Sequence, residues 1–298
     1  MDKLNLQNYP YLRKHFGNSG EYLQTGHPLE SSNLEYLAHV ENILRTIDGI
    51  PNLAGKIKES KAITNWESVF SEFEFAERLM PLKPEFIKRE NKSVVIDLKA
   101  TLFGEDIFFE VKTLAQTELN SEIHEEISKI PSDLCVTLNG IVTEKEEVGK
   151  IVDFLKEKIS INETGDFTAG YFGINIEKKI HKYPNQKTLI ISSFQTPFNW
   201  IKYKISKTFS DNLRQFRSRS PIFWVIDCKK ISYSHYGFKV ILLNAIEGLF
   251  YLEDAKCLNG VIALIHGNVD LFLNPNVKKK LDGNSVAELK DLLFAELY

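Results

Sequence analysis

The chain has 298 residues, a hydrophobic fraction of 43% and a formal net charge of −3. This length and composition predict a globular protein with a sizeable core, built as one large domain with extensions or as two small domains. The negative net charge argues against a protein that coats DNA regardless of sequence, because such proteins are clearly basic.

Three widely spaced cysteines, Cys135, Cys228 and Cys257, match neither a disulfide framework nor a zinc motif. A reducing, cytoplasmic environment is therefore expected. The sequence shows no signal-peptide pattern, and no apolar run approaches the roughly 20 residues that a membrane-spanning helix needs. We expect no membrane partner.

The first part of the chain predicts helices. Residues 1–60 are expected to form a helical extension, in which the clearest helix covers residues 33–47. A second helix is predicted over residues 66–80, because apolar residues recur there with helical spacing and Pro84 follows. Residues 85–89 are predicted to form a first strand.

Within the second helix, Glu72 lies inside one flank of the apolar stripe and Glu77 lies near the other flank. A carboxylate within a packing face is costly unless it has a partner. One interpretation is a boundary glutamate that pairs with Arg78 or another base. The other interpretation depends on the segment that follows.

Residues 94–113 (VVIDLKATLFGEDIFFEVKT) predict two strands around a tight turn. Side chains alternate between the two faces of a strand, so Glu110 and Lys112 share one face, roughly 6 to 7 Å apart. We place Gly104-Glu105 at the centre of a two-residue turn. Asp97 then lies opposite Lys112 at about 5 Å, with Glu110 on the diagonal at about 7 to 8 Å.

These three side chains on one face suit a metal-dependent nuclease. Two carboxylates that converge on a partly apolar site repel each other unless a cation joins them. Mg²⁺ suits the site because it binds few protein oxygens and keeps waters and substrate phosphate oxygens as further ligands. Lys112 would orient or deprotonate the attacking water, or neutralise charge on the phosphate.

The alternative is a surface hairpin with an ordinary Asp–Lys pair, worth less than about 1 kcal/mol. The apolar runs at residues 94–96 and 107–109 argue against a solvated hairpin. An unrelated interaction domain with surface acids would place Asp97 and Lys112 on opposite faces and leave Glu72 in solvent.

The pattern resembles the motif of the PD-(D/E)XK nuclease superfamily: Asp on one strand, then Glu or Asp, any residue, and Lys on the next strand. The matching positions are Asp97, Glu110, Val111 and Lys112. The interval between the two acids is similar to that of archaeal-type Holliday-junction resolvases and restriction-enzyme-like families. Ile96 stands where the motif has proline, and the similarity covers about residues 62–230 with a long interruption.

The resemblance implies an α/β fold of the α+β type: a restriction-endonuclease-like core with a central mixed sheet flanked by helices. The implied ligands of Mg²⁺ or Mn²⁺ are Asp97, Glu110, the backbone carbonyl of Val111 and, directly or through water, Glu72. Lys112 would act on the nucleophilic water. Nucleic acid, with DNA as the first choice, is the implied substrate; a homodimer and a role in restriction or phage defence are compatible with the resemblance. The alternative is a catalytically inactive module of the same fold that binds nucleic acid or protein.

The core is expected within residues 61–230, interrupted by an insertion at 115–205 that is longer than an ordinary connection. Within the insertion we predict strands at 134–138 and 188–192, a helix at 144–159 and a mobile loop at 162–173. Residues 231–298 are expected to form a C-terminal extension that packs on the core, with a short strand at 270–275 and a final helix at 285–298.

A basic segment at residues 202–219 includes a predicted helix at 209–216 and precedes a predicted buried strand at 222–226. Basic residues beside a metal site suit a phosphate backbone. The candidate nucleic-acid-binding residues are Lys204, Lys207, Arg214 and Gln215. Lys207 and Gln215 are expected two turns apart on one helix face. The alternative is a solvated face that keeps the protein soluble.

Overall fold

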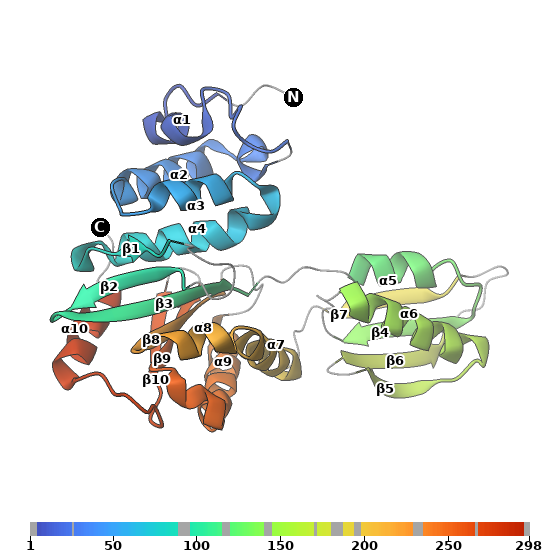
Figure 1. The fold of residues 1–298 in the computed structure, drawn as a ribbon. Helices are drawn as coiled ribbons and strands as arrows, with labels where there is room; N and C mark the ends of the chain where they lie inside the picture. Colours follow the sequence, from blue (N-terminus) through green and yellow to red (C-terminus); the bar gives the residue numbers. More distant parts are fainter. Residues whose placement is uncertain are drawn as a thin grey trace. The chain divides into compact units, whose positions relative to one another are not determined.

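The computed structural model describes residues 5–25, 27–88, 96–114, 120–139, 145–169, 172–179, 187–193, 198–228, 235–265 and 268–294. The chain forms two compact units (Figure 1). Unit 1 comprises Met1–Leu114, Asp211–Lys229 and Phe250–Tyr298. Unit 2 comprises Ala115–Ser210 and Lys230–Leu249.

Unit 1 contains a six-stranded mixed sheet in the order β1-β2-β3-β8-β9-β10. Its strands are β1 (Glu85–Phe86), β2 (Leu98–Leu102), β3 (Glu105–Thr113), β8 (Ile222–Asp227), β9 (Gly260–Ile265) and β10 (Asn268–Leu273). Strands β3, β8 and β9 are parallel, and the outer pairs are antiparallel. Every residue of β8 and β9 is buried, as expected for parallel strands that are covered on both faces.

Helices flank this sheet on both faces, which confirms the expected mixed sheet with flanking helices. On one side, Figure 1 shows α1 (Pro10–Phe16), α2 (Leu34–Ile47), α3 (Leu53–Ser60) and α4 (Ile63–Arg78) stacked in layers, with α4 next to the sheet. Phe75 of α4 packs 5.3 Å from the ring of Phe109. On the other face, Phe216 of α8 (Leu213–Ser218) packs 5.6 Å from the ring of Trp224. Helix α10 (Gly283–Phe294) ends the described chain.

Local sequence accounts for these helices. The Asn33 side chain accepts a hydrogen bond from the Tyr36 amide at 2.8 Å and so caps α2 close to its expected start. The continuous helix α4 ends at Arg78, before a short 3-10 turn at Met80–Leu82 that contains Pro81. Further short 3-10 helices cover Pro28–Ser31 and Glu253–Cys257.

The β2–β3 hairpin corrects the expected register. The turn is Phe103-Gly104, with φ of 49° and 81°, and Leu102 pairs with Glu105. Lys99 therefore faces Phe108, not Glu110, because the turn lies one residue earlier than Gly104-Glu105. Because the turn moves by one residue, each residue of β2 pairs with a residue two positions earlier in β3 than expected. A shift of two residues leaves every side chain on its expected face. If this register is extended by one residue before β2, Asp97 lies opposite Glu110 instead of Lys112.

Unit 2 contains a four-stranded sheet in the order β5-β6-β4-β7. Its strands are β4 (Leu134–Asn139), β5 (Gly165–Ala169), β6 (Phe172–Lys178) and β7 (Leu189–Ser193). Helices α5 (Asn120–Ile127) and α6 (Lys145–Ser160) share a core with the sheet, in which Val136 and Leu155 are fully buried. Helices α7 (Phe198–Asp211) and α9 (His235–Phe250) complete the unit's described elements.

Two expectations for the middle of the chain are wrong. The segment 162–173 contains β5 and the start of β6 instead of a loop, because Phe167 turns inward and packs 5.7 Å from the ring of Phe154. The single helix expected at 209–216 is broken at Asn212, where α7 has ended and α8 begins. Lys207 and Gln215 therefore lie on different helices. None of the described helices has the length and apolar character needed to cross a membrane.

Candidate active site

Asp97 immediately precedes β2, at the end of the hairpin where the pairing of β2 with β3 begins. Its carboxylate oxygen Oδ2 accepts a hydrogen bond from the backbone amide of Val111 at 3.0 Å, in place of a ladder bond from β2. Its own carbonyl accepts a bond from the Ile87 amide at 3.1 Å. In an extended strand the N–H and C=O of one residue point to the same edge. Val111 therefore presents its carbonyl oxygen to the edge that Asp97 occupies.

Glu110 and Lys112 project from β3 beside this point. The Lys112 ammonium Nζ lies 2.6 Å from Glu110 Oε1, and Glu110 is 0% exposed. Glu110 Oε2 has no hydrogen-bond partner among the residues that the structure describes. Burial and the neighbouring Asp97 raise the pKa of Glu110 to about 8. The surroundings of Glu110 therefore supply too little positive charge and too few hydrogen bonds to offset the burial of its ionised form.

Glu72 approaches Asp97 from α4 and meets a lysine there. Lys56 of α3 places its Nζ 2.5 Å from Glu72 Oε2 and 3.2 Å from Asp97 Oδ1. Glu72 is 3% exposed, Asp97 4% and Lys56 3%. Burial and Asp97 hold the pKa of Glu72 well above its usual range, although Lys56 opposes them. Burial by itself would lower the pKa of Lys56, but Asp97 and Glu72 outweigh it and raise that pKa.

Asp97 is the shared neighbour of the two ion pairs. It raises the pKa of both Glu72 and Glu110, so it lies within electrostatic range of both. Burial opposes the charge on Lys112, yet Glu110 and Asp97 raise its pKa. The structure therefore brings together all four predicted catalytic residues: Asp97, Glu110, Lys112 and Glu72. The acids are buried, unlike those of an ordinary surface hairpin.

Sequence reasoning missed Lys56, although a signal for it exists. The buried residues of α3 are Leu53, Lys56, Ile57 and Ser60, which follow helical spacing. A lysine inside such an apolar stripe must find acids in the interior. Glu72 was expected to pair with Arg78 or another base. It forms an ion pair with Lys56, a base on the preceding helix α3. Glu77, the reserve candidate, is only half-buried on α4.

A second polar cluster lies at the C-terminal ends of β3 and β8. The Ser71 hydroxyl donates to Asp227 Oδ2 at 2.6 Å and lies 2.8 Å from the Thr113 hydroxyl. Asp227 is buried, and its carbonyl accepts a bond from the Leu114 amide at 2.8 Å. These bonds join α4 to both strands next to Lys112, and so help to hold the backbone on which the candidate site is built.

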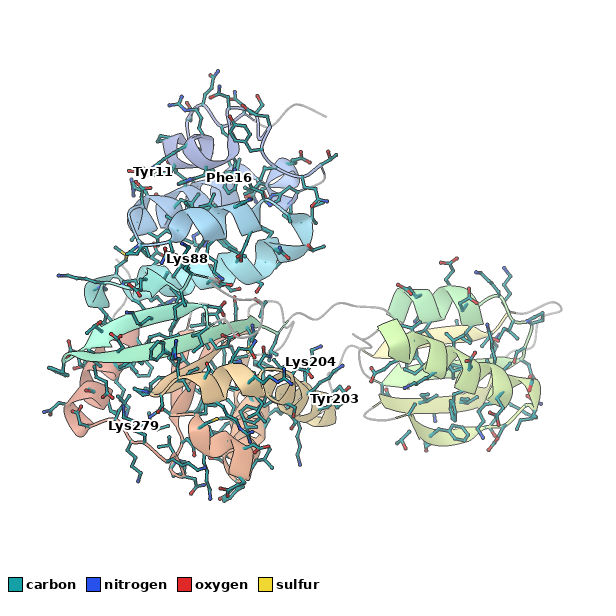
Figure 2. All side chains as sticks on the ribbon, in the orientation of Figure 1. Tyr11, Phe16, Lys88, Tyr203, Lys204 and Lys279 are labelled. Atoms are coloured by element: carbon teal, nitrogen blue, oxygen red, sulfur yellow. The ribbon has the colours of Figure 1, made fainter. Side chains whose placement is uncertain are left out.

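The candidate nucleic-acid-binding residues do not share one element. Lys204 and Lys207 lie on α7 in unit 2, and both side chains are half-buried. Figure 2 labels Lys204 and Tyr203 of this helix, and Lys207 Nζ lies 5.9 Å from the Tyr203 ring centroid. Arg214 and Gln215 lie on α8 in unit 1, exposed and half-buried respectively. The structure thus divides the expected basic face between the two units.

The acids suit a divalent cation by chemistry. Within the described chain, no group of three or more His, Cys, Asp and Glu side chains is arranged to hold a metal ion. A Mg²⁺ site of the implied kind needs fewer, because waters and phosphate oxygens complete its shell. Asp97, Glu110 and the Val111 carbonyl supply oxygens at one edge of β3, and within the described part of the chain Glu110 Oε2 is a buried oxygen without a hydrogen bond. The residues present therefore fit the group.

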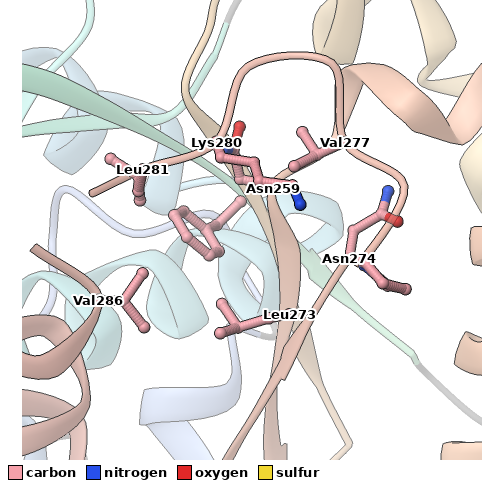
Figure 3. Close-up of a pocket in the computed structure, with 9 residues that line it drawn as sticks. Asn259, Leu273, Asn274, Val277, Lys280, Leu281 and Val286 are labelled. Atoms are coloured by element: carbon pink, nitrogen blue, oxygen red, sulfur yellow. The ribbon is translucent and has the colours of Figure 1, made fainter. Parts of the chain in front are cut away.

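A depression of about 210 Å³ lies elsewhere in unit 1 (Figure 3). Apolar side chains line most of it: Phe223, Leu273, Val277, Leu281 and Val286. Its asparagines serve the backbone, since Asn259 Oδ1 accepts from the Ile222 amide at 3.1 Å and Asn274 Nδ2 donates to the Leu258 carbonyl at 2.9 Å. These contacts tie loop ends together and give the depression no evident chemistry.

No protein-family model, curated protein or solved structure matches the chain. A functional assignment therefore depends on the geometry and chemistry of the site. The buried group of Asp97, Glu110, Lys112 and Glu72 is the strongest basis for one.

Proposed function

We propose that the chain is a Mg²⁺- or Mn²⁺-dependent nuclease that hydrolyses phosphodiester bonds in nucleic acid, with DNA as the expected substrate. One observation carries the proposal: Asp97, Glu110 and Lys112 converge where the pairing of β2 with β3 begins, and a buried oxygen of Glu110 has no hydrogen bond from any residue that the structure describes. A structural ion-pair network has no use for such an oxygen, because an unpaired buried acceptor is costly.

Each residue has a role that follows from its place. Asp97, Glu110 and the Val111 carbonyl would hold the metal ion. When bound, the ion would supply a Lewis acid that activates water and offsets charge on the phosphate. Lys112, 2.6 Å from Glu110, would orient the attacking water and neutralise charge that develops on the phosphate. Glu72 would orient Asp97 and the waters around it.

The test compares two lysines on the same hairpin. Lys112 and Lys99 have similar side-chain exposure, 29% and 25%, but Lys99 pairs with Glu85 and Asp106 away from the acids. Cleavage of supercoiled plasmid and of single-stranded DNA is measured with Mg²⁺, Mn²⁺ or EDTA. We expect Lys112→Ala to reduce metal-dependent cleavage by at least about 100-fold. Lys99→Ala serves as the matched control and should cleave like the wild type.

A nuclease that needs a specific target sequence would cut neither of these substrates. If neither is cut, metal binding tests the proposed nuclease instead. Calorimetric titration with Mn²⁺ should show a site in the wild type that Asp97→Asn weakens strongly. Absence of Mn²⁺ binding by the wild-type chain would overturn the proposal. Equal cleavage by Lys112→Ala and the wild type would also overturn it.

A second candidate function is a catalytically inactive module of the same architecture that binds nucleic acid or protein. The observation that favours it is Lys56, whose ammonium already contacts Glu72 and Asp97. If this contact is permanent, an internal cation satisfies the acids and no metal enters. Wild-type protein that binds nucleic acid but no Mn²⁺ would support this second function.

A further inference from the structure

Lys56 has two sets of acidic partners within reach. Its ammonium lies 2.5 Å from Glu72 and 3.2 Å from Asp97, both of them buried. It also lies 3.7 Å from Glu59, one turn further along α3. The Glu59 side chain is 25% exposed, compared with 4% for Glu72. The lysine therefore stands between an inner and an outer partner.

A depression in unit 1 adjoins this lysine. It measures about 330 Å³, and both Lys56 and Glu59 line it, together with the first turn of α3 and the residues from the end of β1 to Lys88. Figure 2 labels Lys88. A Cβ atom built on Gly55, another lining residue, would meet nothing within 4 Å, so this side of the helix is open. The Lys56 ammonium already lies 3.7 Å from Glu59, so a small rotation about the bonds of the lysine side chain would bring the two groups together.

The charge balance of the cluster favours a divalent cation that replaces Lys56 over one that binds beside it. The inner cluster holds three carboxyl groups, Glu72, Asp97 and Glu110, against the ammonium groups of Lys56 and Lys112. With all of them ionised, as they would be around a bound cation, one negative charge is left over. A divalent cation added beside Lys56 would leave one positive charge in a buried place, which is costly. A divalent cation that replaces Lys56 makes the cluster neutral.

We propose that Lys56 is an exchangeable internal counter-ion: it holds Glu72 and Asp97 together in the metal-free protein and moves to Glu59 when a divalent cation binds. The inference rests on the proposed function, because it concerns loading of the same site. Lys56 is a positioning residue here. It keeps the two acids folded inward without metal, and it weakens metal binding by the work needed to displace it.

The test is calorimetric titration of Mn²⁺ into the full chain, comparing wild type with Lys56→Met, which keeps the length of the side chain and removes the charge. We expect Lys56→Met to bind Mn²⁺ at least about tenfold more tightly, because no competitor remains. Lys58→Met changes an exposed lysine of the same helix and should bind like the wild type. Unchanged or weaker binding by Lys56→Met would overturn the exchange, and a purely structural lysine gives that result.

Glu59→Gln provides a second test that does not depend on the folding of Lys56→Met. Loss of the outer partner should weaken Mn²⁺ binding, since the displaced ammonium then has a poorer place to go. Binding equal to the wild type would contradict the proposed movement. The outcomes separate the two proposals: Mn²⁺ binding that is indifferent to both variants overturns only the exchange, whereas no Mn²⁺ binding by any variant overturns the proposed nuclease as well.

Discussion

Glu110 makes the stability of the metal-free protein depend on pH in a predictable direction. Its pKa is about 8 in the folded protein, against an ordinary value of 4.5. The folded state therefore binds the proton more tightly than the unfolded chain does. The stability from this group is fully present below pH 4.5 and is lost as the pH rises through about 8.

The size of the effect follows from the shift. At about 1.36 kcal/mol for each pH unit, the full difference amounts to about 5 kcal/mol, of which about 4 kcal/mol falls between pH 5 and pH 8.5. A typical domain is stable by only about 5 to 15 kcal/mol, so the loss is a large part of the total. Glu110→Gln carries no titrating group at this position, and we expect it to remove the part of the pH dependence that Glu110 contributes, while the part from the raised pKa of Glu72 remains.

Urea denaturation in EDTA, followed by tryptophan fluorescence, measures the change. All variants carry Trp200→Phe, because Trp200 lies on α7 in unit 2. The other two tryptophans, Trp66 and Trp224, are fully buried in unit 1, so the remaining emission reports on the unit that contains Glu110. His27, whose pKa burial lowers, titrates alike in both proteins and cancels in the comparison. Glu105→Gln, at the half-exposed start of the same strand, is the matched control and should follow the wild type. Parallel loss of stability in wild type and Glu110→Gln between pH 5 and pH 8.5 would refute the reasoning.

Two further predictions concern the scaffold. Phe103 adopts a left-handed conformation (φ 49°) and is 68% exposed, so Phe103→Asn should raise the free energy of unfolding by about 1 kcal/mol, measured by urea denaturation. A loss of stability would mean that the exposed ring makes contacts that outweigh the backbone strain. Ser71→Ala removes a donor to buried Asp227 and should cost about 1 to 3 kcal/mol in the same assay. An unchanged midpoint would show that this hydroxyl contributes nothing to stability.

Sequence predicts most reliably where local pattern decides the outcome. The apolar run at 222–226 is the buried strand β8, and the helix predicted at 66–80 corresponds to α4, which covers Ile63–Arg78. The faces of the hairpin are also as expected, because alternation along a strand does not depend on the register. The register itself was wrong, since it follows from the turn. Phenylalanine is a poor signal for a left-handed turn position, and Gly104-Glu105 looked equally suitable.

Long-range contacts explain the remaining misses. Lys56 lies 41 residues before Asp97, and nothing near it in the sequence indicates which acids it meets. Segment 162–173 is polar because one face of β5 is open to solvent, while Phe167 and Ala169 on its other face pack against the core of unit 2. The break at Asn212 separates two basic stretches that composition treats as one. In each case tertiary structure, not local propensity, decides the result.

The imbalance of charge at the acids is the strongest argument that this cluster is a site and not a structural network. A network that only holds a fold together is often no better than an apolar core of the same shape, and is stable only when every member has a partner. Here three buried acids share two lysines, and one carboxylate oxygen of Glu110 has no hydrogen bond in the described chain. An apolar residue at position 110 would remove that cost at once. In the metal-free protein the raised pKa of Glu110 lets a proton offset this imbalance. With all three acids ionised, a divalent cation in the place of Lys56 would offset it, as we propose.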